Sequence, residues 1–222
     1  MLNNTKPTFN SEYYQKASPS TPTEIIDYLK RYIPSNRKAW DCGTGNGQTA
    51  IKLAKFIDNI HATDISKNQL SRAFTHPNIK YFETDESNSM FDDESVDLIT
   101  ASQAAHWFDI PKFRKECLRI LKQNGVVAIW TYHREIQING KTEVIYEDFL
   151  NTISSYFLKG PGYYTDIYKN INFNLPILKA PKFKQIKQMH FNDFIKFLKS
   201  ISGYTEYFKK NKRCPIITSV RN

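Results

Sequence analysis

The chain has 222 residues, and its 31 Lys and Arg residues against 22 Asp and Glu residues give a net charge of +9. A hydrophobic content of 40% is enough for one domain-sized core, with room for an appended lid. The sequence contains no run near the roughly 20 apolar residues of a membrane span, and its start lacks the apolar core of a signal peptide. Cys42, Cys117 and Cys214 have no metal-ligand spacing, so we expect reduced thiols and a cytoplasmic protein.

Positive charge is concentrated in the second half of the chain. Residues 1–111 carry 11 basic and 14 acidic side chains, a net charge of −3, whereas residues 112–222 carry 20 and 8, a net charge of +12. Such a half can face nucleic acid, an anionic membrane or acidic small molecules, or it can be a solvated lysine-rich surface. Lysine outnumbers arginine and no basic cluster alternates with aromatic residues, so the sequence does not predict a nucleic-acid partner.

Helix-like and strand-like segments alternate through the first 130 residues. Helical spacing and short apolar runs predict helices over 22–33, 46–56, 67–74 and 111–121, and strands over 37–42, 60–63, 79–83, 96–100 and 126–130. Thr21 is the expected cap of the first helix, and Gly125 closes the last. The alternation predicts an α/β fold with a doubly wound, mostly parallel sheet, in which 126–130 is a buried strand.

The second half is less regular. We expect a helix over 144–158, a strand over 183–191, a helix capped by Asn192 and a last short strand over 214–220.

A glycine-rich turn joins the first strand to its helix. Asp41 stands before it, and Gly43, Gly45 and Gly47 follow at alternate positions. Glycine permits backbone angles that side chains forbid, and it lets a ligand approach the backbone and the helix N-terminus. The dinucleotide-binding pattern G-x-G-x-x-G needs its third glycine one residue later, where this chain has Gln48. The pattern D-x-G-x-G-x-G resembles motif I of class I methyltransferases, which use S-adenosylmethionine (SAM).

The resemblance implies that this loop contacts SAM. The expected contacts are Asp41, Gly43, Thr44, Gly45 and Gly47. Asp41 can orient the loop or reach the methionyl ammonium, and a buried Asp needs a partner in either case.

Acidic residues follow the second and third predicted strands. Asp64 ends the second strand 17 residues after Gly47, close to the spacing of about 20 for a ribose-binding acid. Its carboxylate can accept hydrogen bonds from both ribose hydroxyls, with Ile65 packing on the adenine. Asp85 follows the third strand, where it can accept from the adenine amino group, and Glu86 is the alternative for that role.

The segment 101–109 follows the fourth strand, at the edge where open α/β sheets bind ligands. Ser102, Gln103 and Trp107 are expected cofactor contacts. His106 is the one candidate catalytic residue: it acts as general base for a hydroxyl, amine or thiol acceptor, or it packs beside the cofactor. A carboxylate acceptor would need no base, because it is already ionised at neutral pH. The other histidines lack metal-ligand spacing, so no metal site is predicted.

The run A-A-H-W-F-D at 104–109, followed by R-I-L-K-x-x-G before an apolar strand, is similar to the type 11 group of methyltransferases. Within that group the chain most resembles the trans-aconitate methyltransferase-like branch, over 9–130 and more faintly to 207. The resemblance implies a helical cap and a small-molecule acceptor, a carboxylate in that branch. Residues 18–22 lack the Arg and Tyr of the branch pattern R-P-x-Y-P, and little sequence follows the cap helix.

Together these features predict a Rossmann-like class I methyltransferase fold with a helical cap and a shortened C-terminal end. We expect one domain over 1–222, with a SAM-binding core (1–134), a cap (135–210) and a tail or last strand (211–222). Two other classes stay open: a degenerate SAM-binding protein without turnover, and a nucleotide-dependent oxidoreductase, against which the glycine spacing counts. A nucleic-acid methyltransferase is a minor alternative.

Overall fold

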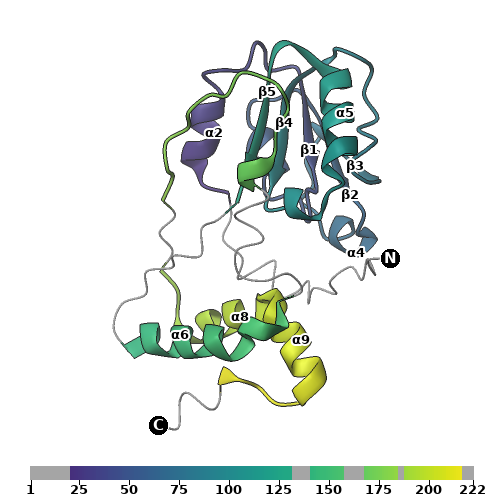
Figure 1. The fold of residues 1–222 in the computed structure, drawn as a ribbon. Helices are drawn as coiled ribbons and strands as arrows, with labels where there is room; N and C mark the ends of the chain where they lie inside the picture. The colour runs from purple at the N-terminus through teal and green to yellow at the C-terminus, as the bar shows by residue number, and fades with distance from the viewer. Residues whose placement is uncertain (1–20, 132–140, 158–167, 185–187, 217–222) are drawn as a thin grey trace. The chain divides into compact units, whose positions relative to one another are not determined.

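The computed structural model describes residues 21–131, 141–157, 168–184 and 188–216. The chain divides into two compact units (Figure 1). One contains the sheet and is described over 21–131 and 168–184; the other is helical and is described over 141–157 and 188–216. None of the described helices is long and apolar enough to cross a membrane.

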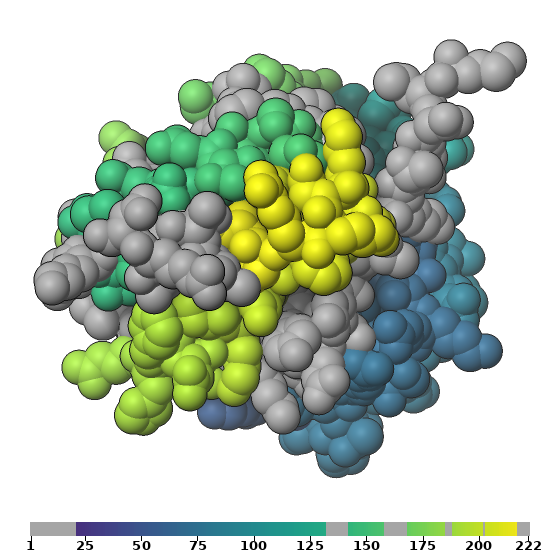
Figure 2. Space-filling model, turned by 90° about the horizontal axis from the view of Figure 1, so that it is seen from below, coloured from purple at the N-terminus to yellow at the C-terminus, as the bar shows by residue number. Residues whose placement is uncertain are grey.

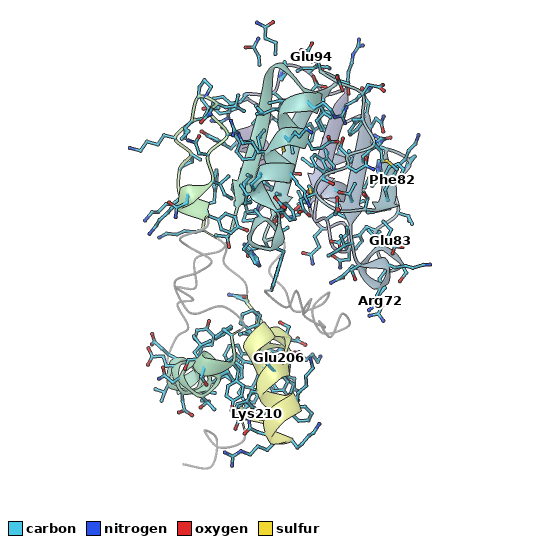
Figure 3. The ribbon with its side chains drawn as sticks, turned by 45° about the vertical axis from the view of Figure 1, so that its right-hand side comes forward. Arg72, Phe82, Glu83, Glu94, Glu206 and Lys210 are labelled. Atoms are coloured by element: carbon cyan, nitrogen blue, oxygen red, sulfur yellow. The ribbon has the colours of Figure 1, made fainter. Side chains whose placement is uncertain are left out.

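The sheet has five parallel strands in the order β3-β2-β1-β4-β5. They are β1 (Lys38–Cys42), β2 (Asn59–Asp64), β3 (Ile79–Glu83), β4 (Val96–Ser102) and β5 (Leu121–Trp130). The predicted doubly wound, parallel α/β sheet is therefore confirmed. Because all strands run the same way, their carboxyl ends meet at one edge. Glu83 at that edge and Glu94 before β4 mark opposite ends of the sheet (Figure 3).

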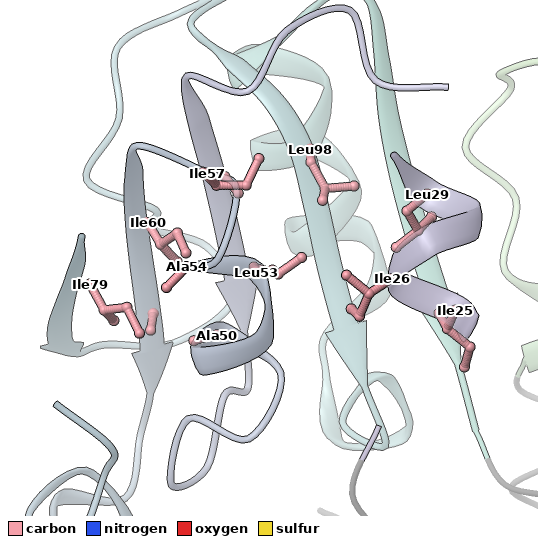
Figure 4. Close-up of a cluster of buried hydrophobic side chains, with 12 residues drawn as sticks. Ile25, Ile26, Leu29, Ala50, Leu53, Ala54, Ile57, Ile60, Ile79 and Leu98 are labelled. Atoms are coloured by element: carbon pink, nitrogen blue, oxygen red, sulfur yellow. The ribbon is translucent and has the colours of Figure 1, made fainter. Parts of the chain in front are cut away.

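One face of the sheet is covered by α2 (Thr23–Leu29) and α3 (Ala50–Leu53) (Figure 4). Leu53, Ile57, Ile60 and Leu98 are fully buried there. Each such side chain stabilises the fold by roughly 1.5–3 kcal/mol. Ala50 and Leu53 of α3 belong to this cluster, so the helix that follows the glycine loop packs against the sheet.

The other face is covered by α5 (Ile110–Ile120), which Figure 1 shows on the opposite side of the sheet from α2. Its Phe113 packs on Trp40 of β1, with ring centroids 5.6 Å apart. The Asp109 side chain caps α5 by accepting from the backbone N–H of Lys112. Two short helices stand at the carboxyl edge, α4 (Lys67–Leu70) and η1 (Ala105–Trp107).

Three helix predictions in the sheet unit need correction. The Thr21 hydroxyl caps no helix: it bonds Thr49 Oγ1 at 2.8 Å, and α2 begins at Thr23. The predicted helices 46–56 and 67–74 shrink to α3 and α4. In the first case the cause is Gly47, whose φ of +81° takes the loop out of the helical region.

Apolar residues after position 168 return to the sheet unit, so the predicted cap of 135–210 is interrupted. Phe173 packs against the cluster around Trp40, and Phe183 packs against the cluster around Ile25. Tyr28 fixes this segment further, because its hydroxyl donates to the Lys179 carbonyl at 3.4 Å.

The two late strands are wrong where the structure describes them. Residues 183–184 and 188–190 carry no strand, and Phe191 begins a helix. Residues 214–216 carry no strand either, and the rest of the predicted strand lies outside the described residues.

The helical unit consists of α6 (Lys141–Ile153), η2 (Ser154–Tyr156), α8 (Phe191–Ser200) and α9 (Ser202–Asn211). Aromatic and aliphatic side chains from all of them form a separate core around Phe149, and α6 lies beside α9 (Figure 2). The resemblance to one cap helix over 191–207 is corrected to two helices, because Ile201 adopts an extended conformation between them. Asn192 is not the cap: His190 precedes α8 and makes no side-chain cap bond.

Candidate active site

The glycine loop adopts the conformation that only glycine tolerates well. Gly43, Gly45 and Gly47 have φ angles of +67°, +59° and +81°. A Cβ on Gly43 would collide with Ala104, and one on Gly47 would collide with the Tyr81 hydroxyl. Among the described residues nothing lies within 4 Å of a Cβ built on Gly45. Packing therefore requires the outer two glycines, while the middle one faces open space.

Asp41 fastens the loop to the neighbouring strand. It is 1% exposed, and it accepts hydrogen bonds from the Thr44 hydroxyl at 2.6 Å and the Thr100 hydroxyl at 2.7 Å. Burial raises the pKa of Asp41 to about 6, although both hydroxyl bonds act in the other direction. Thr44 adds a link to β2, because its N–H donates to the Thr63 carbonyl at 2.9 Å.

Asp64 lies beside the open face of Gly45. One carboxylate oxygen accepts from the Gly45 N–H at 2.8 Å, and the other accepts from the Ser66 N–H at 2.8 Å. A carboxylate accepts up to about four hydrogen bonds, so these two are compatible with further donors. Ile65 follows with 44% of its surface exposed. The structure thus brings a carboxylate and an exposed aliphatic side chain to the glycine loop.

Asp85 and Glu86 follow β3 and make local bonds. Asp85 accepts from the Ser87 N–H at 2.9 Å and from the Ser87 hydroxyl at 2.6 Å. Glu86 accepts from the Asp109 N–H at 2.7 Å, which ties the segment after β3 to the start of α5. The two acids are thus engaged differently: Asp85 orders its own turn, and Glu86 joins two elements.

Ser102 and Gln103 lie where β4 ends. The Ser102 hydroxyl is 3.4 Å from the Thr21 hydroxyl. The Gln103 N–H donates to the Trp130 carbonyl at 3.0 Å, and the Thr131 hydroxyl donates to Gln103 Oε1 at 3.1 Å. Within the part of the chain that the structure describes, Gln103 Nε2 and Trp130 Nε1 are buried without a hydrogen-bond partner.

His106 and Trp107 form η1 just beyond this point. His106 Nδ1 lies 3.2 Å from the Tyr168 hydroxyl, and its ring is tilted against Trp107 with centroids 4.9 Å apart. Both rings are half-buried. The contact with Tyr168 orients the His106 ring at the carboxyl edge of the sheet.

The sequence did not predict the residues that form hydrogen bonds with the expected site residues. Thr100 could have been found, since it is a polar residue inside the apolar run of β4. Tyr168 and Trp130 carried no signal, because their contacts depend on tertiary structure and on the register of β5. His61 is structural: it stacks on Phe91 with centroids 3.7 Å apart. Among the described residues no group of three His, Cys, Asp or Glu could hold a metal ion.

Known proteins that resemble this chain are methyltransferases, whose cofactor the glycine loop was expected to contact. A family model for a methyltransferase domain matches residues 40–129. A candidate methyltransferase of Dictyostelium discoideum is 31% identical over 207 residues, which are 91% of this chain and 79% of that protein. The yeast protein CRG1, described as an S-adenosylmethionine-dependent methyltransferase, is 26% identical over 133 residues, 56% of this chain and 46% of that protein. The chain thus spans less than half the length of this second relative.

A solved structure from Anaeromyxobacter dehalogenans, described as a type II methyltransferase, superposes with a TM-score of 0.73 at 23% identity, covering 91% of this chain and 86% of that one. This likeness confirms the Rossmann-like fold. The chain belongs to the family of SAM-dependent methyltransferases. The comparisons do not reach the trans-aconitate-like branch, nor do they identify an acceptor.

The residues of the loop suit SAM. The open face of Gly45 leaves room for a ligand against the backbone. Asn46 Nδ2, in the same loop, is a buried donor with no partner among the described residues, and SAM carries a carboxylate that could accept from it. The Asp64 carboxylate, which accepts from the Gly45 N–H, lies at the same place.

Proposed function

We propose that the chain transfers the methyl group of SAM to a small molecule that carries a carboxylate. The observation that carries the proposal is the carboxyl edge of the sheet, where the open face of Gly45, the carboxylate of Asp64 and the segment from Ser102 to Trp107 meet. Open α/β sheets bind ligands at this edge. The choice of a carboxylate draws on the resemblance to the trans-aconitate-like branch and on the basic second half of the chain.

In this proposal the cofactor lies along the ends of β1, β2 and β3. Asp64 accepts from the ribose hydroxyls, Ile65 covers the adenine, and Asp85 or Glu86 accepts from the adenine amino group. Gly43, Thr44, Gly45 and Gly47 shape the loop, and Asp41 holds it through Thr44 and Thr100. Ser102 and Trp107 line the methionyl end.

SAM supplies an electrophilic methyl group on a positive sulfur. The chain's task is to hold the acceptor close to that methyl group, in line and away from water, which lowers the barrier mainly through positioning. A carboxylate is already the nucleophile at neutral pH, so it needs no general base. His106, positioned by Tyr168, then acts as a wall of the site rather than as a catalyst.

The sheet unit is proposed to bind SAM. We expect the protein to act in the cytoplasm, because Cys42, Cys117 and Cys214 are all free thiols in the structure.

The test is a methyl-transfer assay with radiolabelled SAM. Trans-aconitate and other small carboxylates are the acceptors, and the trimethyl ester of trans-aconitate is the matched control without a free carboxylate. We expect label in the carboxylates and none in the ester. Label in hydroxyl or amine acceptors but in no carboxylate would contradict the proposal.

A second candidate is a SAM-binding protein without turnover. It is favoured by one observation: residues 18–22 lack the Arg and Tyr of the branch pattern R-P-x-Y-P. Full SAM affinity without transfer to any acceptor would select it.

A further inference from the structure

The part of the chain that returns to the sheet unit carries an exposed apolar loop. Every residue from 174 to 182 is exposed. Within this loop the side chains of Leu175, Ile177 and Leu178 are 37%, 91% and 52% exposed, and Ile177 is the most exposed of the large apolar residues that the structure describes. Single exposed aliphatic residues are ordinary on a protein surface, whereas several together indicate an interaction site.

The loop is fixed to the sheet unit at both of its ends. Before it, Phe173 packs against the cluster around Trp40. After it, the Phe183 ring meets the Tyr28 ring of α2 with centroids 5.7 Å apart, and the Tyr28 hydroxyl donates to the Lys179 carbonyl. Figure 1 shows this stretch, in green, passing beside α2. The exposed apolar side chains therefore lie between two points that are anchored in the core.

Positive charge flanks the loop. Residues 168–184 contain four lysines, at positions 169, 179, 182 and 184, and no acidic residue or arginine. Lys179, Lys182 and Lys184 are exposed. Arginine suits the paired hydrogen bonds of a single carboxylate or phosphate, whereas lysine acts as a point charge. A group of lysines without arginine therefore fits a broad negative surface better than one anionic group.

A pair of tyrosines lies beside the loop. Tyr28, which donates to the Lys179 carbonyl, packs against Tyr32 with ring centroids 4.9 Å apart, and Tyr32 is 40% exposed. Tyrosine is enriched where proteins meet the membrane–water interface, because its ring is apolar and its hydroxyl is polar. Exposed aliphatic side chains, lysines and tyrosines thus occur together on this part of the sheet unit.

We propose that the loop 174–182 binds the surface of an anionic lipid bilayer. Leu175, Ile177 and Leu178 enter the boundary between headgroups and acyl chains, and the flanking lysines lie among the negative headgroups. Apolar burial and electrostatic attraction act together in this kind of binding, which needs no helix that crosses the membrane. The inference goes beyond the proposed function and does not depend on SAM.

The charge of the loop counts against a second copy of the chain as the partner. Dimers are mostly symmetric, so the same surface of both copies would meet. Lys179, Lys182 and Lys184 would then lie against the same lysines of the other copy, and like charges repel. An anionic bilayer carries the complementary charge.

Two variants change the loop, and two matched variants change other exposed positions of the sheet unit. Ile177→Asp replaces the aliphatic side chain by a charge, and Lys182→Glu reverses one positive charge. Met90→Asp is the control for the first, because Met90 is 52% exposed but is followed by acidic residues at 92–94. Lys115→Glu is the control for the second, because Lys115 is an exposed lysine of α5. All four side chains are exposed, so each variant should keep the thermal unfolding temperature of the wild type.

The measurement is co-sedimentation of the full chain with neutral vesicles of phosphatidylcholine and with anionic vesicles of phosphatidylcholine and phosphatidylserine in equal parts. We expect binding to the anionic vesicles to be at least about tenfold tighter than to the neutral ones, since each lysine near an anionic surface contributes about fivefold. Ile177→Asp should weaken binding to anionic vesicles about tenfold or more, the effect of burying one aliphatic side chain. Lys182→Glu should weaken it about fivefold or more, while both controls stay within about twofold of the wild type.

A wild type that does not sediment with the anionic vesicles would overturn the proposal. So would Ile177→Asp protein that binds them like the wild type, or a control that weakens binding as much as its loop variant, since net charge alone would then explain the binding. Self-association that Ile177→Asp abolishes would assign the loop to a second copy of the chain. Binding of polyglutamate, but not of the anionic vesicles, would assign it to an acidic protein. Either result would contradict the bilayer as the partner.

Discussion

Burial destabilises the charged form of the Asp41 carboxylate, and its hydrogen bonds offset this cost only partly. Its carboxylate is fully buried, and the hydroxyls of Thr44 and Thr100 donate to it. Burial raises the folded-state pKa from 3.8 to about 6. The folded protein therefore binds this proton more tightly than the unfolded chain, so the stabilisation is complete below about pH 4 and is lost as the pH rises through 6.

Asp41→Asn should remove this pH dependence. The amide is neutral, and hydroxyls can donate to its oxygen or accept from its nitrogen. A shift of about 2 pH units corresponds to about 3 kcal/mol. We expect Asp41→Asn to gain up to that amount over the wild type between pH 4 and pH 7, measured by urea unfolding at each pH. A constant difference between the two proteins across this range would show that Asp41 is not buried as a costly anion.

Asp64→Ala tests the acid beside the glycine loop. Hydrogen bonds to a charged carboxylate contribute roughly 1.5–3 kcal/mol each, so the loss should weaken SAM binding at least about tenfold. Asp58→Ala is the control, because Asp58 is exposed just before the amino end of the same strand. Unchanged SAM affinity in Asp64→Ala would end the assignment of this residue to the ribose.

His106→Asn separates a wall from a general base. The Asn side chain can keep a hydrogen bond to Tyr168, whereas it cannot take up a proton near neutral pH. Loss of a general base costs roughly 10²–10⁴ in rate. For a carboxylate acceptor we expect the rate to stay within about threefold of the wild type, with the same pH profile. A loss of a hundredfold or more would make His106 a catalyst.

The three glycines of the loop differ in what an added side chain would meet at each position. Alanine at Gly43 or Gly47 combines a strained φ with a collision, whereas alanine at Gly45 meets only the strain. A left-handed residue with a Cβ costs about 1–2 kcal/mol, and a forced overlap adds about 1–3 kcal/mol. We expect thermal unfolding to show Gly43→Ala and Gly47→Ala as less stable than Gly45→Ala, which should instead weaken SAM binding most. If Gly43→Ala or Gly47→Ala weakened SAM binding more than Gly45→Ala, the open face of Gly45 would not be where the ligand approaches.

Strands of the sheet were predictable, and helix lengths were not. β3 has its predicted bounds. β5 contains the predicted 126–130, but it begins at Leu121 and is half-buried there rather than fully buried, because polar Lys122, Gln123 and Asn124 extend the strand. The helix expected over 46–56 is shortened to α3, because its expected start includes Gly47, whose φ of +81° excludes a helix. The strand expected over 183–191 failed because alternation in a short segment does not say whether a neighbouring strand is available. Phe183 packs on a core cluster instead, and Phe191 begins α8.

The contacts of the site also fall into two groups, those that the sequence predicts and those that depend on the tertiary structure. Asp64 and Gly45 could be paired from the sequence, because strand ends in a parallel sheet meet at one edge. The bond between Asp41 and Thr100 joins residues 59 positions apart, and that between His106 and Tyr168 joins residues 62 apart. Such contacts follow from sheet order and from the return of 168–184, neither of which a local pattern encodes.

At the scale of the molecule, the sheet and the helices have separate cores. Leu53 is fully buried in one and Phe149 in the other. Truncating such side chains costs about 2–5 kcal/mol, felt first in the unit that contains them. We expect Phe149→Ala to speed amide hydrogen exchange in 141–157 and 188–216, with exchange in β1 and β2 and the affinity for S-adenosylhomocysteine unchanged. We expect Leu53→Ala to speed exchange in β1 and β2 instead, with exchange in 141–157 and 188–216 unchanged. Equal acceleration of exchange everywhere in both variants would mean a single cooperative core.

SAM is expected to bind at the carboxyl edge of this sheet. Calorimetric titration of the purified protein with SAM, S-adenosylhomocysteine and NAD is the first measurement to make. We expect saturable binding of the first two ligands and none of NAD. Binding of NAD, or no binding of SAM and its product, would contradict it.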